Sequence, residues 1–310
     1  MGKYKLINNV LGWIVFAIAS TVYLMTMEPT ASFWDCGEFI SSAYKLEVGH
    51  PPGAPFFMLT ANLFTQLASD PSTVAKMVNT MSALFSGLTI LFLFWSITHL
   101  ARKIIVKDGE EASLGQMITI MGSGLVGALA YTFSDTFWFS AVEGEVYAYS
   151  SLFTAVVFWL ILKWEATYDK PHADRWIVLI AYLMGLSIGV HLLNLLCIPA
   201  IVLVYYYKKF PNPTMKGTLV ALLASFAIVA LMMYGVVQGL VEVCGYFELL
   251  FVNTFGMPYN SGVYAFVIIL AASLIWAIWE TMQDEIHPVR MKISFILSIV
   301  LLGIPFIGSG

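Results

Sequence analysis

Two carboxylates and an imidazole lie close together near the amino-terminal end of the chain. Asp35 and Glu38 are three residues apart, so they share one face if this segment is helical. His50 follows Glu38 by twelve residues. A carboxylate beside a hydroxyl can act as a general base. Because these groups follow a strongly apolar segment, and ionisable groups are costly at the mouth of a membrane bundle, they point to chemistry.

Each of these features also has a purely structural interpretation. Ser32 and Asp35 have the spacing of a capping box, in which an acid in the first turn also complements the helix dipole. The triplet His50-Pro51-Pro52 can mount an imidazole rigidly, because proline fixes φ and restricts the preceding residue. It can equally be a loop whose prolines start the next helix. Spacing alone leaves both interpretations open.

A second group of polar residues lies in AVEGEVYAY. Glu143 and Glu145 precede an apolar run, where first-turn acids satisfy free N–H groups. They can also form a donor or acceptor pocket facing the first loop. Tyr147, with Trp138 and Tyr149, can stack on a sugar or peptide, or can lie at the membrane interface.

Two outer lysines, Lys45 and Lys76, and two histidines, His50 and His191, make a sparse site for an anion. His191 and Asn194 lie at the outer end of an apolar run, where they can contact a lipid phosphate or only pack. Lys76 can bind a phosphate or extend its ammonium group to the interface. The sequence contains no glycine-rich phosphate loop, no cluster with metal-ligand spacing and no nucleic-acid patch. We therefore expect no metal ion and no cofactor.

The composition is that of an integral membrane protein. Of 310 residues, 59% are hydrophobic and only 11% are charged, whereas soluble domains average about 25% charged residues. Three well-separated cysteines make a disulfide framework improbable. The first apolar run is long and no cleavage site precedes Glu28, so we expect a retained helix rather than a signal peptide.

The apolar runs predict an all-α polytopic membrane protein with about nine transmembrane helices. The first outer loop, 28–73, contains two amphipathic helices, 33–47 and 54–68, on the membrane surface. The chain ends as a ninth helix would emerge, which is typical of a piece of a longer protein. The predicted spans are 9–27, 74–100, 115–134, 145–164, 176–191, 193–207, 217–241, 262–280 and 291–307.

The lysines and arginines predict the orientation. With the amino terminus inside and the helices alternating, 13 of the 15 basic residues fall on the inner side, and only Lys45 and Lys76 fall outside. The loops 28–73, 135–145 and 242–261 then face the outside. In a Gram-negative bacterium the chain would lie in the inner membrane, with a cytoplasmic amino terminus and a periplasmic active site.

Four stretches together resemble the GT-C glycosyltransferases. Among these enzymes, the chain is similar to the protein O-mannosyltransferases and to the bacterial family labelled DUF2723. The resemblance extends over essentially the whole chain. The stretches are FWDCGEF (33–39), GHPPGAP (49–55), FWFSAVEGEVYAYSSLF (137–153) and GLSIGVHLLNLLCIPA (185–200).

This resemblance implies a fold and a reaction. The fold is a single GT-C-like transmembrane domain over 1–310, as the amino-terminal part of a longer architecture. The implied donor is a polyprenyl-phosphate sugar, with mannose as the expected sugar, and the implied acceptor is a hydroxyl, commonly Ser or Thr of an exported protein. Asp35 then acts as the base and Glu38 as a second catalytic contact. The residues left for binding donor or acceptor are His50, Glu143, Glu145, Tyr147, His191, Asn194 and Lys76.

Two departures from the family pattern matter. Its members often carry adjacent acids, whereas Cys36 and Gly37 separate Asp35 from Glu38, so either acid can be the base. They are also longer, so a carboxy-terminal portion or a partner subunit can be needed to complete the site.

Two other classes of protein remain as alternatives. A transporter or flippase of a lipid-linked substrate would place ionisable groups near the bilayer midplane and show an inverted repeat. A non-catalytic assembly subunit would not need the outer acids.

Overall fold

The computed structural model describes residues 2–51, 53–107, 109–170, 172–173 and 175–281. Within these ranges all regular secondary structure is helical, as the sequence predicts. The chain divides into two compact units, Met1–Thr218 and Leu219–Gly310, which are described separately.

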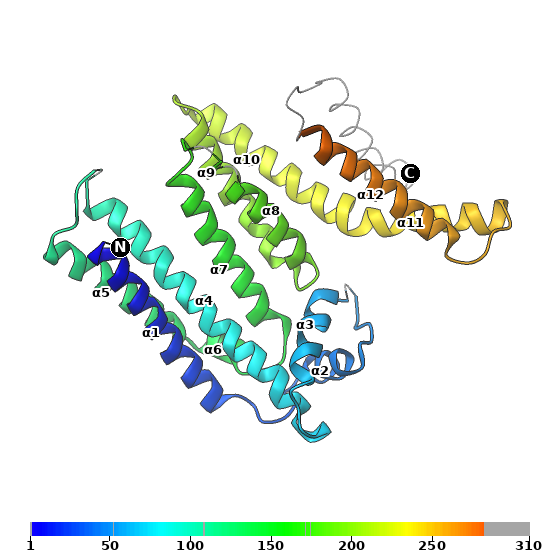
Figure 1. The fold of residues 1–310 in the computed structure, drawn as a ribbon, viewed down its shortest axis with the longest axis horizontal. Coiled ribbons are helices and arrows are strands. Elements are labelled where there is room, and N and C mark those ends of the chain that lie inside the picture. Colours follow the sequence, from blue (N-terminus) through cyan, green and yellow to red (C-terminus); the bar gives the residue numbers. More distant parts are fainter. Residues whose placement is uncertain (1, 52, 108, 171, 174, 282–310) are drawn as a thin grey trace. The chain divides into compact units, whose positions relative to one another are not determined.

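The first unit carries all the candidate site residues (Figure 1). Its helices are α1 (Lys3–Thr26), α2 (Cys36–Lys45), α3 (Pro55–Thr65), η1 (Pro71–Thr73), α4 (Val74–Ile105), α5 (Leu114–Thr132), α6 (Asp135–Ala141), α7 (Val146–Glu165), α8 (Arg175–Ile188), η2 (Leu192–Leu196), α9 (Cys197–Lys209) and the start of α10 (Met215–Ala230).

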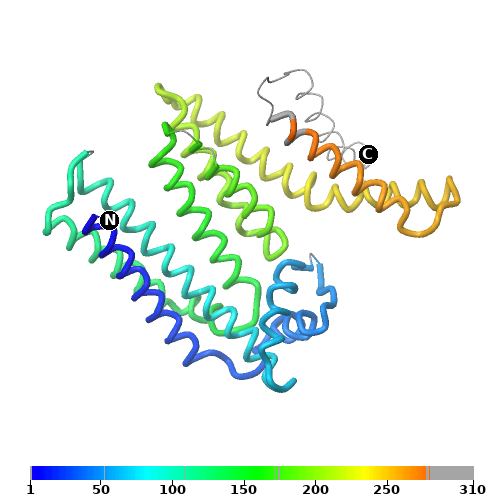
Figure 2. Tube along the Cα trace, in the orientation of Figure 1, coloured from blue at the N-terminus to red at the C-terminus, as the bar shows by residue number. Residues whose placement is uncertain are grey.

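Helix α4 is the centre of this unit, because it packs against α1, α5 and α7. Small residues permit the close approach of α1: a Cβ atom at Gly87 would collide with the Ser20 side chain. The phenol of Tyr4 donates to the Thr98 carbonyl (3.5 Å), so the amino-terminal end of α1 lies beside the later turns of α4 (Figure 2). The α2–α3 hairpin lies at the other end of α4.

The two helices expected in the first outer loop are both present. They are shorter than the predicted ranges 33–47 and 54–68, spanning Cys36–Lys45 and Pro55–Thr65. The Asn62 amide donates to the carbonyls of Ala43 (2.9 Å) and Tyr44 (3.3 Å), so α3 satisfies free acceptors at the end of α2. Phe39 and Phe57 meet edge to face in the core between the two helices.

The second unit corrects one sequence expectation. Residues 242–261 were predicted to form an outer loop, but the helical run that includes α10 continues to Thr254 through η3 (Leu231–Gly239), α11 (Leu240–Leu249) and η4 (Leu250–Thr254). The carboxylate of Glu248 accepts from backbone N–H groups of Asn260, Gly262 and Val263, at the start of α12 (Ser261–Thr281). This acid therefore caps a neighbouring helix rather than marking a loop.

Six helices among the described residues are long and apolar enough to span a membrane, which fits a helical membrane protein. The predicted number of nine is not confirmed. The spans 176–191 and 262–280 correspond to the shorter apolar helices Arg175–Ile188 and Ser261–Trp276, and 291–307 lies outside the described residues. The assignment of 1–310 to one transmembrane domain stays a prediction. The long spans are Lys3–Thr26, Pro71–Ile105, Leu114–Thr132, Val146–Glu165, Leu192–Lys209 and Met215–Thr254.

The segment between α1 and α2 is held by one buried amide. Asn79 on α4 is fully buried and donates to the carbonyls of Glu28 (2.6 Å) and Thr30 (3.0 Å). The N–H of Glu28 in turn donates to the Val142 carbonyl (3.0 Å). These bonds position the chain that leads into Asp35 against α4 and the residues before α7.

Replacing the buried Asn79 by alanine should therefore lower the stability by about 1–3 kcal/mol, because two partly buried hydrogen bonds are lost. Thermal unfolding in detergent measures the loss. Ser82→Ala is the matched control, since Ser82 is also buried on α4 and its hydroxyl has no partner among the described residues. Equal melting temperatures for the two variants would contradict this role of Asn79.

Candidate active site

Asp35, Glu38 and His50 come together at the start of α2. Their carboxylate oxygens and imidazole nitrogen lie within 4.8 Å of one another. Glu38 accepts from the His50 backbone N–H with Oε1 (2.5 Å) and meets the ring Nδ1 with Oε2 (3.0 Å). These bonds lower the pKa of Glu38, and the same hydrogen bond and charge raise the pKa of His50. The pair therefore favours an ionised carboxylate and a charged imidazole.

The local backbone rules out two of the structural interpretations. Asp35 is itself the N-cap residue of α2 and its side chain makes no capping bond, so the capping box of Ser32 and Asp35 is wrong. Helix α3 begins at Pro55, so Pro51 does not start it, and Pro52 lies outside the described residues. Instead, Gly53 at φ 92° donates to the His50 carbonyl (2.8 Å) and closes a turn behind the imidazole.

A single carbonyl joins the α2–α3 hairpin to the segment that carries His191. The first N–H groups of α3, from Phe56 and Phe57, both donate to the Gly189 carbonyl (2.6 and 3.1 Å). Helix N-termini leave such donors free, so this contact satisfies two of them. A Cβ atom at Gly189 would lie 2.8 Å from the Cβ of Phe56, so only glycine permits this approach.

The result is a small cleft of about 90 Å³ at the end of the bundle. The structure brings five of the predicted site residues to its lining, from three separate parts of the chain: Asp35, His50, Glu145, Tyr147 and His191. Glu38 adjoins the cleft through His50. The cleft is thus lined by two carboxylates, two imidazoles and a phenol.

The two imidazoles differ in their electrostatic state. His191 is partly buried, which lowers its pKa, whereas Glu38 raises that of His50. Nδ1 of His191 accepts from the Leu193 backbone N–H (3.1 Å), which leaves the proton of the neutral ring on Nε2. One cleft therefore holds two imidazoles whose pKa values are shifted in opposite directions.

The two glutamates before α7 are both buried. Glu143 is 3% exposed and hydrogen-bonds Ser32 and Cys36, so it lies behind the cleft wall rather than in it. Glu145 is 9% exposed, and no hydrogen bond to its side chain is found among the described residues. Burial, followed by the charges of Glu143 and Asp35, raises the pKa of Glu145 to about 7. Glu145 is therefore poised to exchange a proton near neutral pH.

Two predicted binding residues lie away from the cleft. Asn194 is buried, donates to the Ser187 hydroxyl (2.9 Å) and accepts from Thr154 (3.4 Å), which is a packing role. Lys76 is exposed near the start of α4 and does not line the cleft.

Sequence reasoning missed three residues that build the cleft wall. Ser32 and Cys36 bind Glu143, and Gly189 receives α3. Burial and the charges of both glutamates raise the pKa of the Cys36 thiol to about 12, so it stays protonated and can donate. No local signal identifies these residues, because each acts through a partner far away in the chain.

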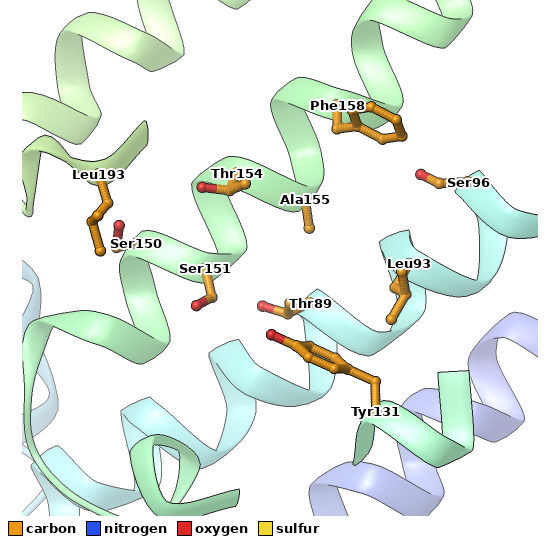
Figure 3. A pocket seen from close by; sticks show the side chains of 10 residues that line it. All are labelled: Thr89, Leu93, Ser96, Tyr131, Ser150, Ser151, Thr154, Ala155, Phe158 and Leu193. Atoms are coloured by element: carbon orange, nitrogen blue, oxygen red, sulfur yellow. The ribbon is translucent and has the colours of Figure 1, made fainter. Parts of the chain in front are cut away.

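A separate cavity of about 330 Å³ lies among α4, α5, α7 and η2 (Figure 3). Its lining combines the hydroxyls of Thr89, Ser151 and Tyr131 with apolar side chains, such as Leu93 and Phe158. No carboxylate, imidazole or ammonium group is among its lining residues. The cavity therefore lacks the acid–base groups that the small cleft has.

Fold and site together define a helical membrane protein with an acid–histidine cleft at one end of its bundle. The family model described as the Protein O-mannosyl-transferase TMEM260 N-terminal domain matches residues 35–214, more than half of the chain. The chain belongs to this family. The match begins at Asp35 and includes every residue that lines the cleft.

Two curated relatives carry the corresponding name. Protein O-mannosyl-transferase TMEM260 of Mus musculus is 28% identical over 174 residues, which cover 56% of this chain and 22% of the relative. Protein O-mannosyl-transferase tmem260 of Dictyostelium discoideum is 26% identical over 148 residues, 47% of this chain and 16% of the relative. The matched region thus spans less than a quarter of each relative. No solved structure matches the chain.

Substituting alanine at Gly189 should separate α3 from the His191 segment and lower the stability by about 1–3 kcal/mol, the usual range for overpacking. Thermal unfolding in detergent measures this. Gly185→Ala is the control, because nothing lies within 4 Å of an added Cβ there and alanine favours the helix. If both variants matched the wild type, the close approach at Gly189 would not matter for the fold.

Glu145 should also make the stability fall as the pH rises from about 4.5 to about 7. Its pKa is higher in the folded chain than in the unfolded chain, so in this interval the folded state binds more protons. The loss is on the order of 1–3 kcal/mol. Melting temperatures recorded across this interval should fall less for Glu145→Gln than for the wild type. Glu47→Gln replaces an exposed acid between α2 and α3 and should keep the wild-type slope. Parallel curves for all three proteins would refute the assignment.

Proposed function

We propose that the chain is the GT-C type catalytic portion of a protein O-mannosyltransferase. In this proposal mannose moves from a polyprenyl-phosphate donor to a Ser or Thr hydroxyl of a protein. The observation that carries the proposal is the cleft itself, where Asp35, His50 and Glu145 meet inside the region that matches the family. Because the chain spans less than a quarter of each of these relatives, the activity of the whole protein is part of the proposal.

The reaction needs a base on one side of the sugar and stabilisation of an anion on the other. We assign the base to Asp35, which is exposed at the cleft and can receive the proton of the acceptor hydroxyl. The bond from the acceptor oxygen to the sugar C1 forms as the bond from C1 to the phosphate oxygen breaks. This in-line displacement inverts the configuration at C1.

The two imidazoles lie in the same cleft as Asp35 and can stabilise the anion that leaves from the other side of the sugar. His50, held charged by Glu38, and the Nε2–H of His191 can both donate to the departing phosphate. Tyr147 lies against His191, with ring centroids 5.4 Å apart, and presents an aromatic surface for a sugar. A protonated Glu145 adds no negative charge next to the anionic donor.

The sidedness is also proposed. The distribution of basic residues supports an inner amino terminus, with the cleft on the outer or luminal side. The DUF2723 grouping, the bacterial inner membrane and the periplasmic site stay predictions. The two relatives described above are eukaryotic, so they do not support the bacterial setting.

Asp35→Asn should abolish mannosyl transfer while the protein still folds and binds donor, since the amide cannot take the acceptor proton. Transfer of radiolabelled mannose from polyprenyl-phosphate mannose to a Ser/Thr peptide measures this, with donor binding measured in parallel. In the control Asp70→Asn, an exposed acid that accepts from the Ser72 N–H is replaced by another capping residue, so activity should be retained.

The outcomes separate the classes of function. Undiminished transfer by Asp35→Asn would show that Asp35 is not the base, and Glu38 and Glu145 would then be the remaining candidates. Absence of donor binding in the wild-type chain would argue against the glycosyltransferase assignment.

A further inference from the structure

Basic side chains gather around a second cavity, at the other end of α7 from the cleft. Glu145 precedes α7 and Lys163 lies in its last turn, roughly 27 Å further along the helix axis. Lys163, Lys5 and Arg102 line this cavity of about 340 Å³, which lies between α1, α4 and α7. Its other lining residues are Tyr4, Asn8, Asn9, Trp95, Thr98, His99 and Trp159.

The three cations lack acidic partners. No carboxylate lines the cavity, and among the described residues Lys5, Arg102 and Lys163 form no ion pair with one. Nearby, by contrast, Lys103 and Lys208 are both paired with the buried Glu165, at 2.6 and 2.5 Å. The neighbouring lysines thus share one compensating carboxylate, whereas the cations around the cavity form no ion pair with an acid among the described residues.

The cations are nonetheless held in place. The guanidinium of Arg102 lies 5.0 Å from the centre of the Tyr4 ring, and the ammonium of Lys163 lies 4.7 Å from that of Trp159. Both distances are typical of cation–π contacts. These contacts fix the charged groups at the cavity wall without neutralising them.

Two buried polar atoms of the same cavity lack a partner. Nε2 of His99 and Oδ1 of Asn8 are buried, and neither has a hydrogen-bond partner among the described residues. A buried polar atom without a partner is unfavourable, so its presence at a cavity indicates a missing ligand. With a proton on Nε2, His99 can donate to an anion once its ring turns toward the cavity, and the Asn8 amide can turn its NH₂ group the same way.

We propose that this cavity binds the phosphate of an anionic phospholipid headgroup. Unpaired cations, fixed by aromatic rings and accompanied by an unsatisfied imidazole, match the chemistry of a phosphate ester. The cavity lies at the end of helices long enough to span a membrane, the level at which headgroups are found. This site is separate from the proposed transfer reaction and does not depend on it.

The test measures lipid binding by the purified chain. The protein is incubated with vesicles of phosphatidylcholine, with or without phosphatidylglycerol, and native mass spectrometry then counts the lipid retained. Phosphatidylglycerol should be retained in preference to phosphatidylcholine. Lys163→Gln and Arg102→Gln should each weaken its retention about fivefold. Lys170→Gln, an exposed lysine outside the cavity lining, is the matched control and should bind like the wild type.

The remaining outcomes also decide the matter. Equal retention of the two lipids, or equal losses in Lys163→Gln and Lys170→Gln, would overturn the proposal. A competition arm with inorganic phosphate distinguishes the sources of the anion. If inorganic phosphate bound the wild type and displaced the lipid completely, while Lys163→Gln failed to bind it, a phosphate site would stand but a soluble ester would replace the lipid as its ligand. Unchanged melting temperatures of the variants would exclude misfolding as the cause of any loss.

Discussion

The candidate site depends on the contact between the Gly189 carbonyl and the first N–H groups of α3. It ties the α2–α3 hairpin directly to the His191 segment, and a shared apolar core that includes Phe57 and Val190 supports it. Each half is organised by local interactions, such as the pair of Glu38 and His50 or the turn that ends at Gly53. The alignment of the two halves depends on backbone atoms. It requires a glycine at 189, which has no side chain, to lie against the free N–H groups at the start of α3.

The environments of the carboxylates give them different properties. Glu38 is 40% exposed and bonded to His50, which favours its charged form. Glu145 is buried and lies near two other acids, which favours its neutral form. Pairs of groups whose pKa values are moved apart in this way are a common basis for dividing acid and base roles. Here the groups are all carboxylates, so the difference in their pKa values comes from their surroundings. Glu38 lies on the α2–α3 hairpin beside His50, and Glu145 lies in the buried segment before α7.

Local patterns in the sequence were sufficient to predict part of this arrangement. The spacing of Asp35 and Glu38 predicts their proximity, and the two short helices follow from apolar periodicity. The sequence could not show that Asn194 packs inside the bundle, since a polar residue at a helix end fits both a binding and a packing role. The prediction of a loop over 242–261 was wrong for a similar reason: Glu248, within it, binds N–H groups more than ten residues further along the chain. Contacts of this kind depend on tertiary packing, which periodicity does not encode.

The ion triad of Lys103, Glu165 and Lys208 has an electrical consequence. Two cations share one carboxylate, so the triad keeps one positive charge even when fully paired. Together with the cations around the second cavity, it makes this end of the bundle strongly electropositive. A transmembrane voltage acts on each such charge with about 2.3 kcal/mol per 100 mV. An energised membrane, negative inside, would therefore hold this end in the inner compartment and oppose inversion of the whole bundle.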